Sequence, residues 1–187
     1  MDHFKTAWPV VKENLVGWVI LGAVFSVLAS FGVGIFLLPN LFRASAKAIE
    51  QNTAPDMADL FNFDNIGDDI VAMLLYGAAQ FVGSLLCGVG AIVTGVLFIW
   101  VPMLAARGHF APVEAMKASL AHAKGNFAPI IIFLIISSVI NSVAVFLCVI
   151  PVFVTLPVTI VAMWQFFGAE ESNIHQAAAA ESIPTKA

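Results

Sequence analysis

The residues of this chain that could bind a ligand or catalyse a reaction gather in two polar stretches and on one helix face. The first stretch, residues 43–69, is rich in aspartate. A calcium loop built from residues 64–68 would need acidic ligands at set spacings and a more distant glutamate, and the sequence has neither. We therefore expect these carboxylates to cap helices or face solvent. They are Asp56, Asp59, Asp64, Asp68 and Asp69.

The second polar stretch, residues 107–125, combines histidine, acidic and basic side chains. The spacing of His109, Glu114 and His122 matches no pattern of metal ligands, so we predict neither a metal nor another cofactor. The basic residues have two interpretations: they hold this loop in the cytoplasm, or they attract anionic lipid headgroups. The predicted headgroup residues are Arg107, Lys117 and Lys124.

A third set of polar side chains lies within an otherwise apolar segment. Ser138, Asn141 and Ser142 share one helix face, and polar groups in hydrocarbon need partners, so this face should be buried against protein. It either joins helices or lines a path for a polar solute. Residues 70–106 and 126–168 carry no charged side chain. This argues against ion-coupled transport, though not against a passive pore.

Motifs of known enzymes are missing from the sequence. It has no Gly-x-Ser-x-Gly, no phosphate-binding loop and no His-Glu-x-x-His. All 4 histidines lie outside the apolar segments. Cys87 and Cys148 lie inside them, where we expect reduced thiols. We predict a non-enzymatic protein without catalytic residues.

The elements that position these residues are predicted to be membrane helices. Of the 187 residues, 60% are hydrophobic and 11% charged, whereas about a quarter of a soluble domain is charged. No lysine or arginine falls within residues 14–42, 70–106 or 126–169, and a soluble protein could not cover so much apolar surface. The net charge of −4 argues against nucleic acid as a partner. The sequence therefore predicts an integral membrane protein.

Three apolar runs, residues 14–49, 70–106 and 126–168, determine the number of spans. A helix of about 20 residues crosses a bilayer, so the second and third runs are each long enough for two helices. Two glycines loosen the backbone near the middle of the second run. The first run is either one span or is bent near residues 30–34. We predict an all-α polytopic bundle of about six transmembrane helices arranged as three hairpins, with five spans as the alternative.

Small residues recur every four positions in the first two runs. On a helix they form a stripe that lets another helix approach closely. The second stripe is continuous only if its helix runs through the two glycines, which argues against a hairpin there. The predicted packing residues are Gly22, Ser26, Ser30 and Gly34 in the first run, and Ala79, Gly83, Cys87, Ala91 and Gly95 in the second.

Two surface helices and a tail complete the predicted organisation. Residues 4–14 are predicted to form an interfacial amphipathic helix with Trp8 at the level of the lipid headgroups, and residues 112–125 a second surface helix. We assign residues 1–168 to one transmembrane helical domain. The alanine-rich residues 169–187 should form a mobile C-terminal tail with no apolar face to bury.

Basic residues predict the orientation. If the second and third runs are hairpins, both polar loops and the C-terminus lie on one side of the membrane. The positive-inside rule makes that side cytoplasmic. If the first run is bent as well, the N-terminus also lies there.

Several short motifs resemble a known group of proteins. They are Leu38-Pro39, the small residues 44–48, Asp59-Leu60-Phe61, Glu114-Ala115-x-Lys117-x-Ser119 and Lys124-Gly125-Asn126-Phe127. Over residues 4–168 the chain resembles small bacterial polytopic inner-membrane proteins of the YciC-like and glycerophosphodiester-phosphodiesterase membrane-domain-like group. The resemblance implies a bacterial inner (cytoplasmic) membrane and about six helices. It implies no catalytic residue, because the phosphodiesterase chemistry of fused members lies in a separate domain.

Three classes of function remain. The first is a protein that self-associates as a homo-oligomer and organises or shapes the membrane, with lipids as its partners. The second is a passive channel or carrier for a small or lipidic solute. The third is an accessory subunit of another membrane complex, recognised through the acidic residues 56–69. The small-residue stripes and the lack of charge inside residues 70–106 and 126–168 favour the first class.

Overall fold

The chain forms helices along most of its length. The structure is a computed structural model that describes residues 2–85, 89–147 and 149–186, so Cys87, Cys148 and the centre of the predicted turn near residue 88 lie outside the described residues. Among the described residues no strand is present, as the sequence predicts, and 83% are helical. The helices are α1 (Asp2–Glu13), α2 (Leu15–Ser30), α3 (Gly34–Gln51), α4 (Met57–Leu60), α5 (Ile66–Ser84), α6 (Val89–Leu97), α7 (Val101–Arg107), α8 (Pro112–Gly125), α9 (Phe127–Leu147) and α10 (Val149–Ala180).

The chain divides into two compact units. The first unit comprises Met1–Asn62 and Phe133–Gly168, and so contains α1 to α4 with parts of α9 and α10. The second unit comprises Phe63–Ile132 and Ala169–Ala187, and contains α5 to α8 with the remaining parts of α9 and α10. The C-terminal residues therefore belong to the second unit and do not form a separate segment.

Membrane-length apolar helices are present, as the composition predicts. Within the described residues, 4 helical segments are long and apolar enough to cross a membrane, or 5 if α1 and α2, which meet at a bend of 104°, make one span. α3 is not among them, because its second half carries Arg43, Lys47 and Glu50. The four segments are Ile66–Ser84, Val89–Arg107, Phe127–Ala144 and Phe153–Ala180.

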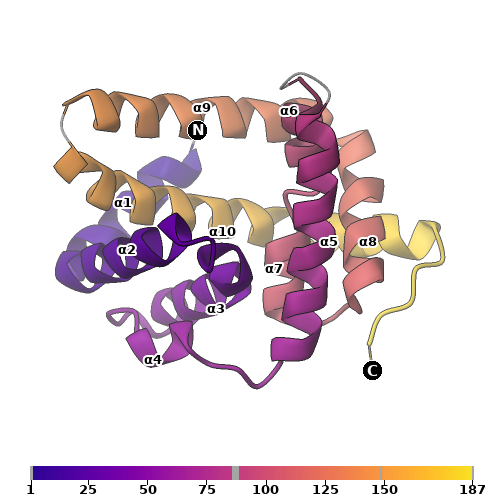
Figure 1. Ribbon diagram of the computed structural model, residues 1–187, viewed down its shortest axis with the longest axis horizontal. Helices are drawn as coiled ribbons and strands as arrows, with labels where there is room; N and C mark the ends of the chain where they lie inside the picture. The colour runs from indigo at the N-terminus through magenta and orange to yellow at the C-terminus, as the bar shows by residue number, and fades with distance from the viewer. Residues whose placement is uncertain (1, 86–88, 148, 187) are drawn as a thin grey trace. The chain divides into compact units, whose positions relative to one another are not determined.

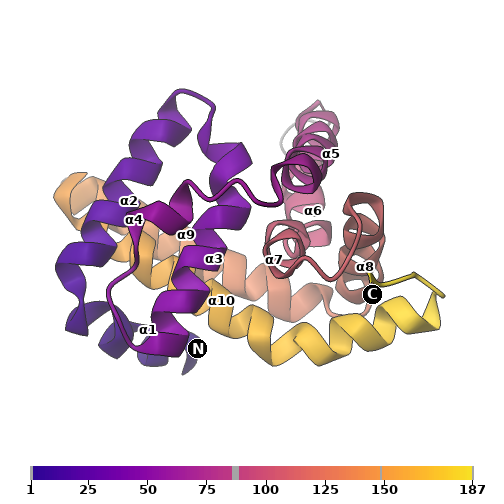
Figure 2. The same cartoon turned by 90° about the horizontal axis from the view of Figure 1, so that it is seen from below.

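The first apolar run turns between α2 and α3. α2 ends at Ser30, the backbone of Gly32 takes a φ of +76°, and α3 begins at Gly34. A β-carbon on Gly34 would lie 2.6 Å from the β-carbon of Ala29, so only glycine fits this close approach. Figure 2 shows α2 and α3 beside each other, joined by this turn.

Aromatic side chains fill the first unit. Trp18 is fully buried, and the rings of Phe42 and Trp164 stack with their centroids 6.1 Å apart. α1 joins the same core through Phe4, whose ring stacks on that of Phe133 at 5.3 Å. Large buried rings of this kind dominate the apolar area that a small unit can remove from its surroundings.

α1 has the two faces of an interfacial helix. Ala7 and Val11 are fully buried, whereas the side chain of Trp8 is 45% exposed. On another side of the helix, the Thr6 hydroxyl donates a hydrogen bond of 2.6 Å to the amide oxygen of Gln165 in α10. The helix is thus fixed to the first unit while the Trp8 side chain stays exposed on its surface.

Helices α5 to α8 build the second unit, and Figure 1 shows α5 and α6 side by side. Trp100 lies at the break between α6 and α7 and is fully buried. Ser119 of α8 bridges this break, since its hydroxyl donates to the carbonyl of Leu97 at 2.8 Å and accepts the N–H of Trp100 at 3.3 Å. Backbone groups near the break therefore find partners in an apolar environment, where leaving them unbonded is costly.

Several residues of the predicted small-residue stripes lie where helices approach each other. Gly83 of α5 faces α6 so closely that a β-carbon would overlap Thr94 and lie 2.8 Å from the carbonyl oxygen of Gly90. A β-carbon on Gly22 of α2 would lie 3.4 Å from Pro157 of α10. The other members vary: Gly34 is buried, Ser26, Ala79, Ala91 and Gly95 are half-buried, Ser30 is exposed, and Cys87 lies outside the described residues.

The C-terminal residues differ from the prediction of a tail without a buried face. α10 continues to Ala180, and the side chains of Ile174, Ala178 and Ile183 are buried. Ile174 and Ala178 are four residues apart and so lie on one side of the helix. The sequence hides this face because alanine contributes little apolar area, and one isoleucine is a weak periodic signal.

Candidate functional site

The polar side chains of α9 bond to α10 within the first unit. The amide of Asn141 donates to the Thr159 hydroxyl at 3.0 Å, and its oxygen accepts from the Thr155 hydroxyl at 3.1 Å. These bonds support the interpretation of Asn141 as a residue that joins helices. The predicted face is nevertheless wrong by one residue, because Ser137 is buried whereas Ser138 and Ser142 are exposed. Positions four residues apart share a face, so Ser137, not Ser138, accompanies Asn141 inward.

The acidic segment is largely occupied by contacts within the chain. Asp56 caps α4 by accepting the N–H of Ala58 at 2.9 Å. Asp59 forms an ion pair of 2.9 Å with Lys47. Asp68 is ion-paired with Lys186. These contacts agree with helix capping and with pairing of charges at the surface.

Arg107 and Glu171 form an ion pair in the second unit. The guanidinium Nε lies 3.2 Å from one carboxylate oxygen of Glu171, and Nη2 donates to the other at 3.3 Å. Because the guanidinium lies within ion-pair distance of both carboxylate oxygens and donates a hydrogen bond to one, the pair orients the carboxylate. Arg107 therefore differs from the prediction of a lipid-headgroup residue. Lys117 and Lys124 are both exposed on α8, as that prediction requires.

His122 of α8 is buried and contacts Glu170, the residue that precedes Glu171 in α10. Its Nε2 lies 3.3 Å from a carboxylate oxygen of Glu170, and its ring meets that of Trp100 edge-on with centroids 6.0 Å apart. Burial lowers the pKa of His122 below its usual range, and the charge of Glu170 offsets part of this lowering. His122 is thus held mainly in its neutral form.

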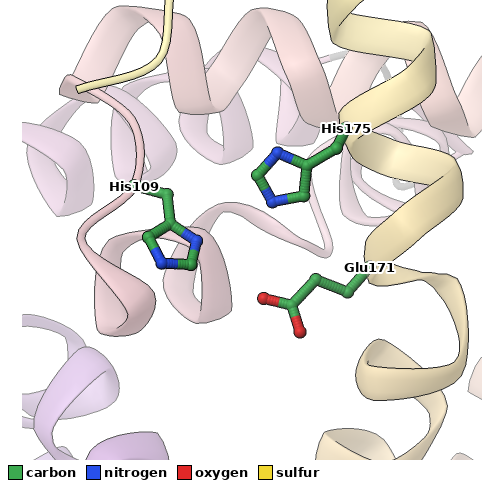
Figure 3. A group of neighbouring side chains, drawn as sticks. All are labelled: His109, Glu171 and His175. Carbon is green, nitrogen blue, oxygen red and sulfur yellow. The ribbon is translucent and has the colours of Figure 1, made fainter. Parts of the chain in front are cut away.

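His109, Glu171 and His175 come together in the second unit, as Figure 3 shows. One ligand atom from each side chain lies within 4.8 Å of the other two. The sequence pattern groups His109 with Glu114 and His122 and does not include Glu171 and His175, which lie in the predicted mobile tail. The signal that could have found them is the Glu-x-x-x-His spacing, which puts both side chains on one face of a helix.

Comparison with models of protein families, with curated proteins and with solved structures finds no match. The resemblance to the YciC-like group therefore stays a prediction. The function has to be inferred from the contacts of the described residues.

A cavity of about 260 Å³ lies between α5, the end of α7 and the start of α8. Its wall contains Asp68, Asp69, Arg107 and Lys186. Both basic residues of this wall are ion-paired, Arg107 with Glu171 and Lys186 with Asp68. Electrostatic attraction of an anionic ligand is weakened by these pairs, so the cavity by itself indicates no substrate.

The lowered pKa of His122 predicts a pH-dependent stability. An unfolded histidine has a pKa of about 6.5. Since the folded state binds the proton less tightly, the stability from neutral His122 is fully present above that pH and declines as the pH falls through the window below it. We expect the melting temperature of the detergent-solubilised protein to be lower at about pH 5.5 than at about pH 7.5, on either side of that pKa. His122→Gln should lose part of this difference, and an unchanged difference in that variant would contradict the assignment.

Proposed function

We propose that this chain is a non-enzymatic membrane protein that self-associates as a homo-oligomer and thereby organises the surrounding bilayer. The observation that carries the proposal is the outer face of α9. Ser138 and Ser142 are exposed there, one turn apart, among the exposed apolar side chains Ile135, Val139 and Val143.

This face has the properties that favour helix–helix association in lipid. Lipid tails are as apolar as leucine, so membrane helices associate through close packing and hydrogen bonds between them, not through the hydrophobic effect. Two serines four residues apart allow a second backbone to approach closely. Each hydroxyl can then bond across the contact, where lipid would offer it no partner.

The proposed arrangement in the membrane is three helical hairpins: α2 with α3, α5 with α6 and α7, and α9 with α10. It is supported by the turn at Gly32, by the close approach of Gly83 to Gly90, and by the hydrogen bonds of Asn141. α3 would then enter the bilayer only with its apolar first half. Arg43 and Lys47 would extend to the surface.

The proposed orientation places the polar loops and the C-terminus in the cytoplasm of a bacterial cell, with the helices in the inner membrane. It is supported by contacts between these segments in the second unit. The ammonium group of Lys186 pairs with Asp68, and the backbone N–H of Lys186 donates to the carbonyl of His109 at 2.7 Å. Exposed Lys117 and Lys124 on α8 would then face the anionic headgroups of the cytoplasmic leaflet.

The two other classes of function have less support. A solute path needs an accessible polar lining, whereas Asn141 is bonded to Thr155 and Thr159. Docking of another membrane protein through the acidic segment needs available carboxylates, whereas Asp59 and Asp68 are paired within the chain.

If the outer face of α9 mediates self-association, larger side chains on that face should reduce the copy number of the oligomer. We expect Ser138→Ile combined with Ser142→Ile to reduce the oligomer to monomers, because two branched side chains keep a second helix at a distance. The measurement is the copy number in lipid nanodiscs by mass photometry. Ser84→Ile is the matched control, since it places the same side chain at an exposed serine of α5 and should leave the copy number unchanged. A wild-type protein that is strictly monomeric under the same conditions would refute the proposal.

A further inference from the structure

We infer that His109, Glu171 and His175 form a binding site for one divalent transition-metal ion, with Zn²⁺ as the best-fitting ion. The inference goes beyond self-association and does not rest on it. All three residues belong to the second unit: His109 follows α7, and Glu171 and His175 lie in the C-terminal part of α10.

The donor set is of the kind that binds such ions. Two imidazoles and one carboxylate favour zinc and neighbouring transition metals, and zinc sites with three protein ligands keep a further position for water. Zinc–nitrogen and zinc–oxygen bonds are about 2.0–2.2 Å long, so donors around one ion stand about 3.4 Å apart. In the structure the three ligand atoms lie within 4.8 Å of one another. Small side-chain rotations would shorten these distances to the value that one ion requires. His109 is exposed and can make this adjustment.

The two ligands from α10 are held in place by their neighbours. The ring of His175 stacks on that of Phe110 with centroids 5.1 Å apart, and it lies 5.6 Å from the ring of His109. Arg107 binds both carboxylate oxygens of Glu171. Each carboxylate oxygen has a second lone pair, so Glu171 can bind an ion while Arg107 still orients it, as outer hydrogen bonds do in metal sites.

The backbone also positions His109. Gly108 ends α7 with a φ of +69°, a left-handed conformation that glycine adopts without strain. This turn directs the chain away from the helix axis toward α10. The carbonyl of His109 accepts the N–H of Lys186, which fixes the residue from its other side. An ion bound here would join segments about 60 residues apart in sequence, and would stabilise the second unit because the unfolded chain does not hold the same ligands together.

The test uses the full-length chain, purified in mild detergent with a tag that contains no histidine and stripped of metal with EDTA. Zinc chloride is then titrated against a chromophoric chelator, and the bound metal is counted by mass spectrometry after desalting. We expect one Zn²⁺ per chain and a higher melting temperature with zinc. His109→Ala, His175→Ala and Glu171→Gln should each weaken binding at least about 100-fold, since loss of an outer partner alone weakens such sites by about 10- to 100-fold.

Two variants, His109→Ala and His3→Asn, distinguish loss of the metal site from a general disturbance of the protein. His109 is exposed, so His109→Ala should fold even if a change at Glu171 disturbs the pair with Arg107. His3→Asn is the matched control, because it removes a histidine of the first unit and should leave both the stoichiometry and the affinity unchanged. The inference is overturned if the wild-type chain binds no stoichiometric zinc, or if His109→Ala and His3→Asn bind it equally well. Neither result would bear on copy number, which is measured separately.

Discussion

Replacing Gly83 by valine is expected to separate α5 from α6 and to destabilise the second unit. A β-carbon at this position would overlap the Thr94 side chain and approach the carbonyl oxygen of Gly90 to 2.8 Å. Thr94 can rotate, but a helix backbone cannot move without shifting the whole contact. We expect the free energy of unfolding to fall by about 3 kcal/mol or more, which is the upper range for overpacking a tight contact. The measurement is unfolding of the detergent-solubilised protein in sodium dodecyl sulfate, followed by circular dichroism.

Gly95→Ala is the matched control for this prediction. Gly95 belongs to the same predicted stripe and lies on α6, but a β-carbon there would meet only the Gln80 amide nitrogen, at 3.7 Å. That distance is ordinary van der Waals contact, and alanine in a helix gains about 0.5–1 kcal/mol over glycine. Equal effects of Gly83→Val and Gly95→Ala would show that the α5–α6 contact does not run through Gly83.

Asn40→Leu is the second substitution with a large expected effect. Asn40 of α3 is 3% exposed, and its amide donates to the carbonyls of Leu60 at 3.2 Å and Asn62 at 2.7 Å. Its amide oxygen accepts from the guanidinium of Arg43 at 2.6 Å. Leucine has a similar volume but no amide group. Each of these partners would therefore lose one hydrogen bond in a buried region. We expect the free energy of unfolding to fall by about 3 kcal/mol, because more than one buried polar group loses its hydrogen-bond partner, at about 1–3 kcal/mol each.

The control for Asn40→Leu is Asn173→Leu. Asn173 is exposed on α10 and donates one hydrogen bond of 3.0 Å to Glu170, so its replacement should change stability by less than about 0.5 kcal/mol. Limited proteolysis gives a second measurement, because loss of the Asn40 bonds should release the segment around α4 and expose it to cleavage. If Asn40→Leu melts at the wild-type temperature and resists protease, Asn40 does not anchor this segment.

The helical class and the apolar segments could be predicted from composition alone. Long stretches without charge need backbone groups that bond within the segment, and a helix provides this locally. The break between α2 and α3 was one of two alternatives, because the length of the first run is compatible with one span or with a bend near residues 30–34. The structure has the turn, with Gly32 at a φ of +76°. The number of spans was less accessible, because α3 is apolar at its start and charged at its end.

Side-chain partners were predicted less well. Asn141 was identified as a polar residue that needs a partner, yet the serine that shares its inward face is Ser137. A shift of one residue on a helix rotates a side chain by about 100°, and sequence spacing alone does not give the direction of the neighbouring helix. Arg107 differs from its prediction for a similar reason, because a basic residue at the end of an apolar segment can pair with lipid or with a glutamate distant in sequence.

The helical class, the apolar segments of membrane length and the lack of known enzyme motifs can all be recognised in the sequence. These properties follow from local composition and from the need of each backbone group for a bond. The folded chain is needed to see that Glu171 and His175 lie beside His109, and that residues 169–180 continue α10. The Glu-x-x-x-His spacing of residues 171–175 is a local pattern, but the approach of His109 depends on packing between segments far apart in the chain. The cluster that could hold a metal ion therefore became visible only in the folded second unit.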